Sequence, residues 1–491
     1  MKKIAIFLTA CTAALASCSD FLDVNEDPNN APTNTPALAL PAGIASAGAR
    51  LGSNYNIMGG MWVQYWAQNN GSNQYKNFDA YIVQQSTLNP DFNELYSGSL
   101  RDLEYARTES KKTGDWNIYL MSTVMQSYVY QMLADIYDEI PFDEALQGNV
   151  VQHPHFRPGQ QVYDSLIVRI DDALGRDFDA STNTDPGKQD LLFSGDVDRW
   201  IQFANTLKLK IYLRQIYARP AVAQSGIEAL YTGGANFLTT SATMSQFDNV
   251  ENKSNPLYEA DRRKLNTGEN IKASKTFMDF LTINDDTLRR EKLFNEGAKG
   301  FRGIEQGNFG ASTVQIVPND ISTAMIGPTD TLYFMSLSEV LFLQAEVAAR
   351  GMGPGTGAAQ GLYETGIQVA FERLGIATGA EDYYDGGPYD YPNGTLEENL
   401  KAIAVQKWAA LAGIEGLEAF FERNRLGYPE FKGLNYDDEG YEPGDLVYPI
   451  GGVTGVGNYP KRLLFPETER NRNPNTPPQV PITTKVWWDK K

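Results

Sequence analysis

The chain has 491 residues, of which 42% are hydrophobic and 21% are charged. This balance indicates a folded globular protein rather than a disordered one, and the length allows two to four domains. The formal net charge of −19 argues against binding to nucleic acid or to anionic membrane surfaces, because like charges repel. Aromatic residues make up 11% of the chain, which suits exposed contact surface as well as core.

The start of the chain, up to Ser17, has the layout of a secretory signal peptide. A basic start, Met1-Lys2-Lys3, precedes a run of apolar and small residues that is too short to span a bilayer. Leu15-Ala16-Ser17 then precede Cys18, in a pattern that resembles the lipobox of bacterial lipoproteins. We therefore predict that residues 1–17 are removed and that Cys18 is lipidated. The alternative is a plain secretory peptide with an incidental cysteine.

Residues 18–36 are predicted to form a lipidated tether, because they become rich in Asn and Pro and lack hydrophobic periodicity. Asp20 and Asp23 follow Cys18 closely, and this partly resembles the surface-export signal of some Gram-negative lipoproteins. No later stretch reaches about 18 consecutive apolar residues, so no transmembrane helix is expected. The only other cysteine, Cys11, lies inside the predicted signal peptide, so the mature chain would contain no disulfide.

Residues 37–232 are predicted to form a mainly helical part. Two helices are expected between residues 37 and 67, with a break near residues 52–56. Residues 94–147 form the clearest helical stretch, since apolar residues recur there every three or four positions. In "ADIYDEIPFDEAL" (134–146) small and aromatic residues fall almost at the packing positions of a tetratricopeptide repeat, so a helical hairpin is expected there. Further amphipathic helices are predicted at 160–174 and 197–218.

The pattern changes between residues 233 and 332, where Asn, Ser, Thr and Gly rise and the helical period fades apart from residues 273–281. We interpret 233–332 as an irregular insert and a candidate ligand face, because long irregular segments often carry function. Residues 333–428 return to helical periodicity, and 429–491 read as an irregular tail that wraps the body. The helices predicted in this second half are 333–351, 358–375 and 396–426.

No catalytic constellation stands out in the sequence. The two histidines, His153 and His155, have no carboxylates or cysteines at ligand spacing, and the glycine-rich run 351–358 follows a helix rather than a strand. Acidic loops at 382–390 and 437–445 could supply a glycosidase pair or hold Ca²⁺, although neither has the spacing of an EF-hand loop. We therefore expect no enzyme activity and no cofactor, with a bound Ca²⁺ as the alternative.

Several segments resemble, in order along the chain, the SusD/RagB-like family of outer-membrane nutrient-binding lipoproteins, and its SusD-like branch in particular. The resemblance implies an all-α fold, in which about four tetratricopeptide-like helix pairs form a superhelical body and an irregular, loop-rich half packs over it. One departure is Asp138, which stands where the family usually has glycine. The matching segments are "CSDFLDVNEDPNN" (18–30), "LADIYDEIPFDEALQG" (133–148), "DLLFSGDVDRWIQFANTLKLKIYLR" (190–214), "EVLFLQAEVAARG" (339–351), "IAVQKWAALAGIEGLEAFFERNRLGYP" (403–429) and "KRLLFPETERNRNPN" (461–475).

The resemblance also implies a role. Proteins of this family sit over a SusC-like TonB-dependent transporter of the outer membrane, lipid-anchored and facing the cell surface, and they bind glycans, or in some members peptides, for import. The leading hypothesis is therefore a surface lipoprotein that binds oligosaccharide and delivers it to such a transporter. The alternatives are a peptide-binding member of the same family and a lipid-anchored glycoside hydrolase.

The family has no invariant ligand motif, so candidate contacts come from aromatic residues beside amides, which suit the apolar faces and the hydroxyls of sugars. Trp62 and Trp66 lie one helical turn apart and give either a ligand face or core packing. Tyr75, beside Asn73 and Gln74, is expected to be exposed in a loop. The ligand-binding candidates are Trp66, Asn73, Gln74, Tyr75, Asn249, Tyr258 and Arg262.

Overall fold

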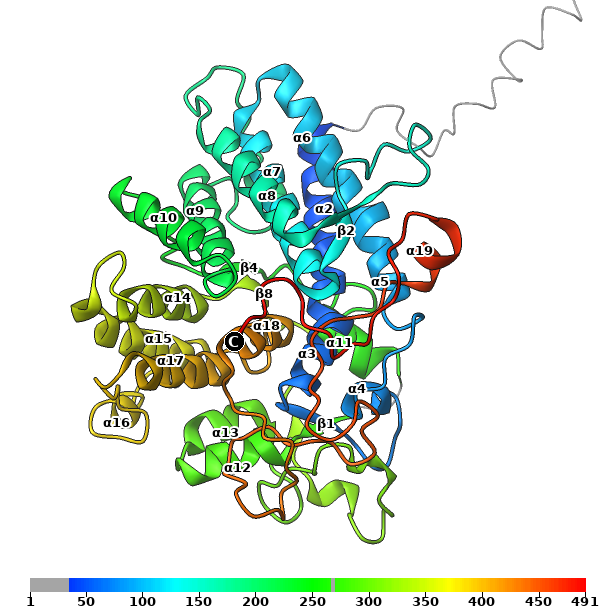
Figure 1. Ribbon diagram of the computed structural model, residues 1–491, viewed down its shortest axis with the longest axis vertical. Helices are drawn as coiled ribbons and strands as arrows, with labels where there is room; N and C mark the ends of the chain where they lie inside the picture. Colours follow the sequence, from blue (N-terminus) through cyan, green and yellow to red (C-terminus); the bar gives the residue numbers. More distant parts are fainter. Residues whose placement is uncertain (1–34, 266–269) are drawn as a thin grey trace, which may run out of the picture.

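The computed structural model of the chain describes residues 35–265 and 270–491. The predicted signal peptide 1–17, Cys18 and nearly all of the tether 18–36 lie outside the described residues. Figure 1 shows long helices in the upper and left parts of the view and shorter elements at the lower end. The predicted fold class is confirmed, since paired helices make up the body and the strands are two to four residues long.

The first two helices are continuous, so the predicted break near residues 52–56 is wrong. α2 (Pro36–Arg50) passes through a π-helical turn at Leu51–Tyr55 directly into α3 (Asn56–Trp62). α3 packs closely against a later helix, because a Cβ atom on Gly59 would lie 2.4 Å from the backbone N of Leu417. Small residues therefore set the separation of these two helices.

α7 (Trp116–Tyr137) is the central helix of the first half, and every residue from Ile118 to Tyr137 is buried. The helical hairpin expected at 134–146 is wrong. α7 ends at Tyr137, Asp138 has a φ of 70°, and β2 (Glu139–Pro141) follows and pairs antiparallel with β3 (Phe156–Pro158). The positive φ and the proline stop the helix there. The other helices of this half are α4 (Lys76–Asp79), α5 (Asn89–Glu94), α6 (Arg101–Thr113), α8 (Gly159–Leu174), α9 (Val197–Arg214) and α10 (Pro220–Thr232).

The C-terminal helices form a second packed group. The predicted stretch 396–426 is two helices, and the first of them begins with a capping box between Thr395 and Glu398. Gly366 lets neighbouring helices approach, since a Cβ atom there would lie 3.0 Å from the ring of Phe342. The helices of this group are α14 (Leu337–Ala349), α15 (Ala359–Arg373), α16 (Glu381–Tyr384), α17 (Leu396–Leu411) and α18 (Gly416–Leu426). A last short helix, α19 (Glu467–Arg472), lies apart from them beside α5 (Figure 1), where Thr468 donates to the side chain of Asn89 at 2.8 Å.

Short strands hold the lower part of the molecule together. A four-stranded antiparallel sheet has the order β1-β5-β7-β6, with Trp66 opposite Ala273 and Phe294 opposite Ala324. It therefore joins a segment from the start of the helical part to segments of the insert, far later in the sequence. The elements here are β1 (Trp66–Gln68), β4 (Ala242–Met244), α11 (Pro256–Tyr258), β5 (Ile271–Ala273), α12 (Lys275–Ile283), α13 (Thr287–Leu293), β6 (Phe294–Asn295), β7 (Thr323–Ala324) and β8 (Leu332–Met335), the last paired with β4.

A buried network of charges connects the two helical groups. Arg425 on α18 donates from Nη1 to Glu346 on α14 at 2.7 Å and from Nε to Glu422 at 2.8 Å. Arg214 on α9 contacts Asp135 on α7 at 3.0 Å as well as Glu418 and Glu422 on α18. Burial raises the pKa of Glu339 on α14, which Lys210 contacts at 2.9 Å. Because these side chains are removed from water, their mutual pairing fixes how the helices meet.

Candidate functional site

The loop that follows β1 turns sharply because a buried glutamine organises it. The side chain of Gln68 accepts a hydrogen bond from the Tyr75 backbone N–H at 2.6 Å and donates to Ser72 Oγ at 2.8 Å. The backbone N–H of Asn69 donates to the carbonyl of Asn270 at 2.9 Å, which fixes the loop against the chain next to β5. Residues 70–74 are therefore held at the surface, where Asn73 and Gln74 are exposed.

A second loop, at residues 305–311, meets the first one. Gly307 has a φ of 77°, and a Cβ atom there would lie 2.1 Å from the carbonyl oxygen of Ile450, so only glycine fits this turn. Its backbone N–H donates to the buried carboxyl of Asp79 at 2.9 Å. This anchor holds Phe309 at the surface in a short 3-10 turn, and its ring is half-buried.

The two loops are joined by an asparagine. Asn70 donates from Nδ2 to the carbonyl of Ile316 at 2.8 Å and to that of Ala311 at 3.3 Å. Because Asn70 belongs to the first loop and both acceptors follow Phe309, the hydrogen bonds fix the ring relative to Asn73 and Gln74.

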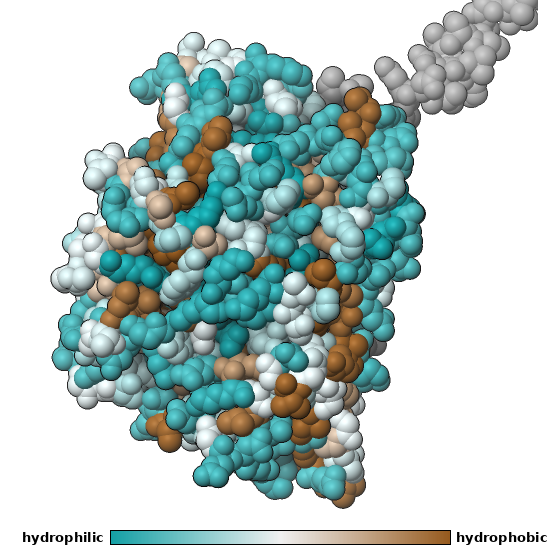
Figure 2. Space-filling view, viewed as in Figure 1, coloured by the Kyte–Doolittle hydropathy of each residue, from teal (hydrophilic) through white to brown (hydrophobic). Residues whose placement is uncertain are grey.

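Phe309 separates two open hollows at the surface. One, of about 530 Å³, is lined by Asn70, Asn73, Gln74 and Phe309 among others. The other, of about 620 Å³, is lined by Phe309, Asn308, Gln315 and Ile450 among others. Figure 2 shows apolar residues gathered toward the lower right of the view, near the end of the molecule where β1 is labelled in Figure 1. Val314, which follows the second loop, is 86% exposed, and Ile450, which lines the second hollow from the C-terminal tail, is 45% exposed.

Among the described residues, the ring of Phe309 stands apart from the hydrophobic core. Within the parts of the chain that the structure describes, it makes no ring–ring or cation–π contact and does not pack against the hydrophobic clusters. Sugar rings stack their C–H faces on such rings, while amide side chains exchange hydrogen bonds with the hydroxyls. The arrangement can therefore hold a neutral, hydroxyl-rich molecule.

Two of the predicted contacts are buried, and the expectation that Tyr75 is exposed is wrong. Its side chain is 5% exposed and its ring stacks on Phe78 at a centroid distance of 6.3 Å, because Gln68 draws this end of the loop inward. Trp66 lies in β1 and is 3% exposed, with its ring against the backbone of Gly60, so it belongs to the core. Asn73 and Gln74 are the two candidates that line a hollow.

The other three candidates lie apart from the hollows, around α11. Asn249 is exposed and accepts a hydrogen bond from Arg263 at 2.8 Å, and the guanidinium of Arg263 lies over the ring of Tyr258 at 5.3 Å. Arg262 contacts Asp261 at 2.8 Å and donates to the carbonyl of Ala324 at 2.8 Å. The contact of Arg262 with Ala324 holds the segment after α11 against β7 within the insert.

Phe309 itself was missed in the sequence. It lies in "GNFGAS" (307–312), where an aromatic residue stands between turn-forming Gly and Asn in an irregular segment. That combination was the available signal, because an aromatic ring on a tight turn has little core to enter. Phe309 lines the same hollow as Asn70 and Gln74, which lie far earlier in the sequence, because β1 pairs with β5.

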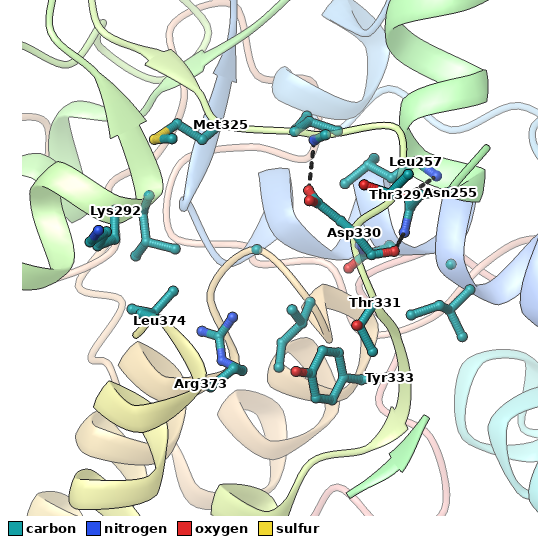
Figure 3. A pocket seen from close by; sticks show the side chains of 18 of the residues that line it. Asn255, Leu257, Lys292, Met325, Thr329, Asp330, Thr331, Tyr333, Arg373 and Leu374 are labelled. Atoms are coloured by element: carbon teal, nitrogen blue, oxygen red, sulfur yellow. Dashed lines mark hydrogen bonds between the residues drawn. The ribbon is translucent and has the colours of Figure 1, made fainter. Parts of the chain in front are cut away.

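A further hollow of about 620 Å³ lies between the helical part and the insert (Figure 3). Arg373 points into it, and the carboxylate of Asp330 accepts the backbone N–H of Gly327 at 2.6 Å. Burial lowers the pKa of Arg373 and raises that of Tyr333. Three residues of this lining are charged, Lys292, Asp330 and Arg373, and the others include amides, threonines and apolar side chains. The Phe309 site differs from it because one aromatic ring there borders a hollow on each side.

Metal ligands do not gather in the described residues. No group of three or more His, Cys, Asp or Glu side chains there is placed to hold an ion. Also within these residues, none of the helices combines the length and the apolar character needed to cross a membrane.

A family model described as "Starch-binding associating with outer membrane" matches residues 29–449. The chain belongs to this SusD-like family. The match covers most of the sequence, including both loops of the Phe309 site and both helical groups. The predicted family is therefore confirmed, and with it an association with the outer membrane as a property of the family.

Solved structures of SusD-like proteins share the fold. A "chitin-binding protein" is 20% identical, with 93% of this chain and 100% of that chain covered and a TM-score of 0.74. A chitin-binding SusD homolog from Flavobacterium johnsoniae is 20% identical, with 92% and 98% covered and a TM-score of 0.73. A SusD homolog from Bacteroides uniformis is 22% identical, with 92% and 99% covered and a TM-score of 0.71. No curated protein sequence matches the chain.

Proposed function

We propose that the chain is a surface lipoprotein of the outer membrane that binds neutral oligosaccharide at the Phe309 site and delivers it to a SusC-like TonB-dependent transporter. The observation that carries the binding role is the half-buried ring of Phe309 between two hollows whose rims hold Asn70, Asn73, Gln74 and Gln315. An aromatic platform flanked by amides is the arrangement that sugars require.

The proposal includes no catalysis. The described residues that line the two hollows include no Asp, Glu or His. Hydrolysis of a glycosidic bond normally needs two carboxyl groups on either side of it. A site of this composition supports capture and release of a sugar chain.

The comparisons support the class of ligand and the location. The family description couples starch binding to the outer membrane, and two of the structural relatives are described as chitin-binding. We propose Cys18 as the point of lipid attachment, because small residues precede it as they do in a lipobox. A tethered protein with an open sugar site is suited to hand its ligand to a transporter in the same membrane.

Calorimetric titration of the purified protein with maltooligosaccharides and chitooligosaccharides tests the proposal. We expect at least one of these neutral series to bind, and Phe309→Ala to weaken that binding about tenfold, because a stacked ring contributes about 1–1.5 kcal/mol. Asn73→Ala and Gln74→Ala should each weaken it by a smaller factor.

Phe178→Ala is the matched control, since that ring is also half-buried but lies in the loop after α8. It should leave sugar affinity unchanged. Binding that survives Phe309→Ala unchanged would contradict the site. A protein that ignores every glycan but enriches peptides from a mixture would contradict the ligand class, and release of reducing ends from a bound polysaccharide would contradict the absence of catalysis.

A further inference from the structure

A basic hollow of about 340 Å³ lies at the C-terminal end of α18. Four of its lining residues are cationic, Arg423, Lys461, Lys485 and Lys491, and the described residues that line it include no Asp or Glu. Figure 1 places the C-terminus beside α18, so the hollow forms where the tail of the chain returns to the helical part. The chain as a whole has a net charge of −19, so four cations around one hollow are unusual for it and indicate a binding site for negative charge.

Arg423 forms the inner wall of the hollow. Its side chain is largely buried, with Nε donating to the carbonyl of Pro429 at 3.2 Å and Nη1 donating to Asn424 Oδ1 at 3.3 Å. The guanidinium lies 4.2 Å from the ring centroid of Tyr459, which holds its plane in place. No carboxylate within the described residues comes within 4.0 Å of it, and its Nη2 has no hydrogen-bond partner there.

The lysines beside Arg423 have fewer acidic partners than positive charges. Lys461 contacts Asp489 at 2.8 Å, and Lys485 approaches the same carboxylate at 3.6 Å. Lys485 also donates to the main-chain oxygen of Lys491, whose ammonium pairs with Glu397. Two carboxylate side chains and the main-chain oxygens at Lys491, where the described chain ends, therefore face four cations, and Arg423 has no carboxylate within 4.0 Å among the described residues. Burial lowers the pKa of Lys461 to about 8 and also lowers the pKa of Arg423, as expected for cations with an incomplete set of counter-charges.

We propose that this hollow binds an oxyanion group, a carboxylate or a sulfate-type group, which completes the charge balance between Arg423, Lys461 and Lys485. The free Nη2 of Arg423 and the lysine ammoniums are the charge-assisted donors that such groups require. The overall negative charge of the chain does not prevent this, since charges farther away than about 8 Å are screened at physiological salt. The site is separate from the Phe309 site and does not depend on it.

Titration calorimetry on the full mature chain tests the proposal, with sodium sulfate, sodium phosphate and sodium glucuronate as probes. Sodium chloride keeps the ionic strength constant, and glucose serves as the neutral counterpart of glucuronate. We expect at least one anion to bind with one site per chain, and glucose not to compete with it. Binding of glucuronate alone would assign the site to carboxylated sugars, whereas equal binding of sulfate and phosphate would assign it to tetrahedral oxyanions.

Variants separate the site from general charge effects. Arg423→Gln should abolish binding but removes a buried side chain, so Lys485→Gln, whose side chain is 48% exposed, is the decisive variant and should weaken binding about fivefold. Lys112→Gln is the control, because that lysine is 69% exposed and pairs with Glu109 on α6. The proposal is overturned if none of the three anions binds below about 10 mM, or if Lys485→Gln and Lys112→Gln have the same effect.

Discussion

The buried carboxyl of Asp79 accepts the backbone N–H of Gly307 at 2.9 Å, and it also accepts a hydrogen bond from the side chain of Gln306. Through this pair the short helix α4 holds the loop that presents Phe309. The cost is a carboxyl group with no exposure to water, and burial raises the pKa of Asp79 to about 8. The geometry of the ligand site is therefore connected to a titrating group behind it.

Asp79 should make stability depend on pH. Because its pKa is raised from 3.8 to about 8 in the folded chain, the folded state holds a proton that the unfolded state releases. Its contribution is fully present below about pH 4 and is lost as the pH rises through about 8. Relative to Asp79→Asn, the natural protein should lose about 4 kcal/mol of unfolding free energy between pH 5 and pH 9, measured by urea denaturation, because each pH unit up to about 8 removes about 1.4 kcal/mol.

Asp179→Asn is the control for that experiment, since Asp179 is exposed in the loop after α8. Its stability profile should run parallel to that of the natural protein. Parallel profiles for Asp79→Asn as well would show that folding does not raise the pKa of Asp79.

Gly307→Ala should disrupt the Phe309 site. The substitution places a Cβ atom 2.1 Å from the Ile450 carbonyl oxygen in backbone with a φ of 77°. We expect a loss of about 2 kcal/mol in stability, measured by urea denaturation, and a loss of sugar binding, measured by calorimetry. Gly310→Ala is matched to it, because a Cβ atom there meets open space in the same loop. If both variants bind sugar like the natural protein, the loop does not position the ligand.

Arg425→Met should be strongly destabilising. It leaves Glu346 and Glu422 buried without the cation that both of them contact, and breaking a buried pair in this way costs about 3–5 kcal/mol. Denaturant unfolding measures the loss. Arg101→Met, on a side chain 67% exposed, should change stability by less than about 0.5 kcal/mol. Similar values for the two variants would mean that the buried network contributes little.

Cys18→Ala should release the protein from the membrane. Each CH₂ of an acyl chain contributes about 0.8 kcal/mol to membrane binding, and the substitution removes the attachment point. Fractionation of cells followed by immunoblotting measures the distribution. Cys11→Ala leaves the predicted lipid site intact and should stay in the membrane fraction. Retention of Cys18→Ala there would refute attachment at this residue.

The helical part of the fold was accessible from sequence because it depends on local periodicity. The helices predicted at 160–174 and 358–375 are observed within a few residues of those limits, as α8 and α15. Residues 134–146 were misread because their small and aromatic residues suit a hairpin, whereas the positive φ at Asp138 and the strand pairing of β2 with β3 determine the structure. Strand pairing depends on partners distant in sequence, which periodicity does not reveal.

The candidate site was only half predictable for the same reason. Asn73 and Gln74 stand out as amides in a polar loop, and they do line a hollow. Tyr75 looked equivalent to them, but its backbone N–H donates to Gln68 and its ring stacks on Phe78 within the hydrophobic core. Phe309 joins the amides only through the sheet and the Asn70 contacts, so no local pattern could place it beside them.

The charged network also determines when the chain can become native during synthesis. Asp135 and Arg214 are made early, but the acids and the arginine that surround them on α18 are among the last helical residues to be made. Until those residues leave the ribosome, Arg214 lacks Glu418 and Glu422, two of the three carboxylates that it contacts in the folded core. We expect the nascent polypeptide to stay loosely packed until α18 has emerged, and limited proteolysis of ribosome-bound chains of increasing length would measure this.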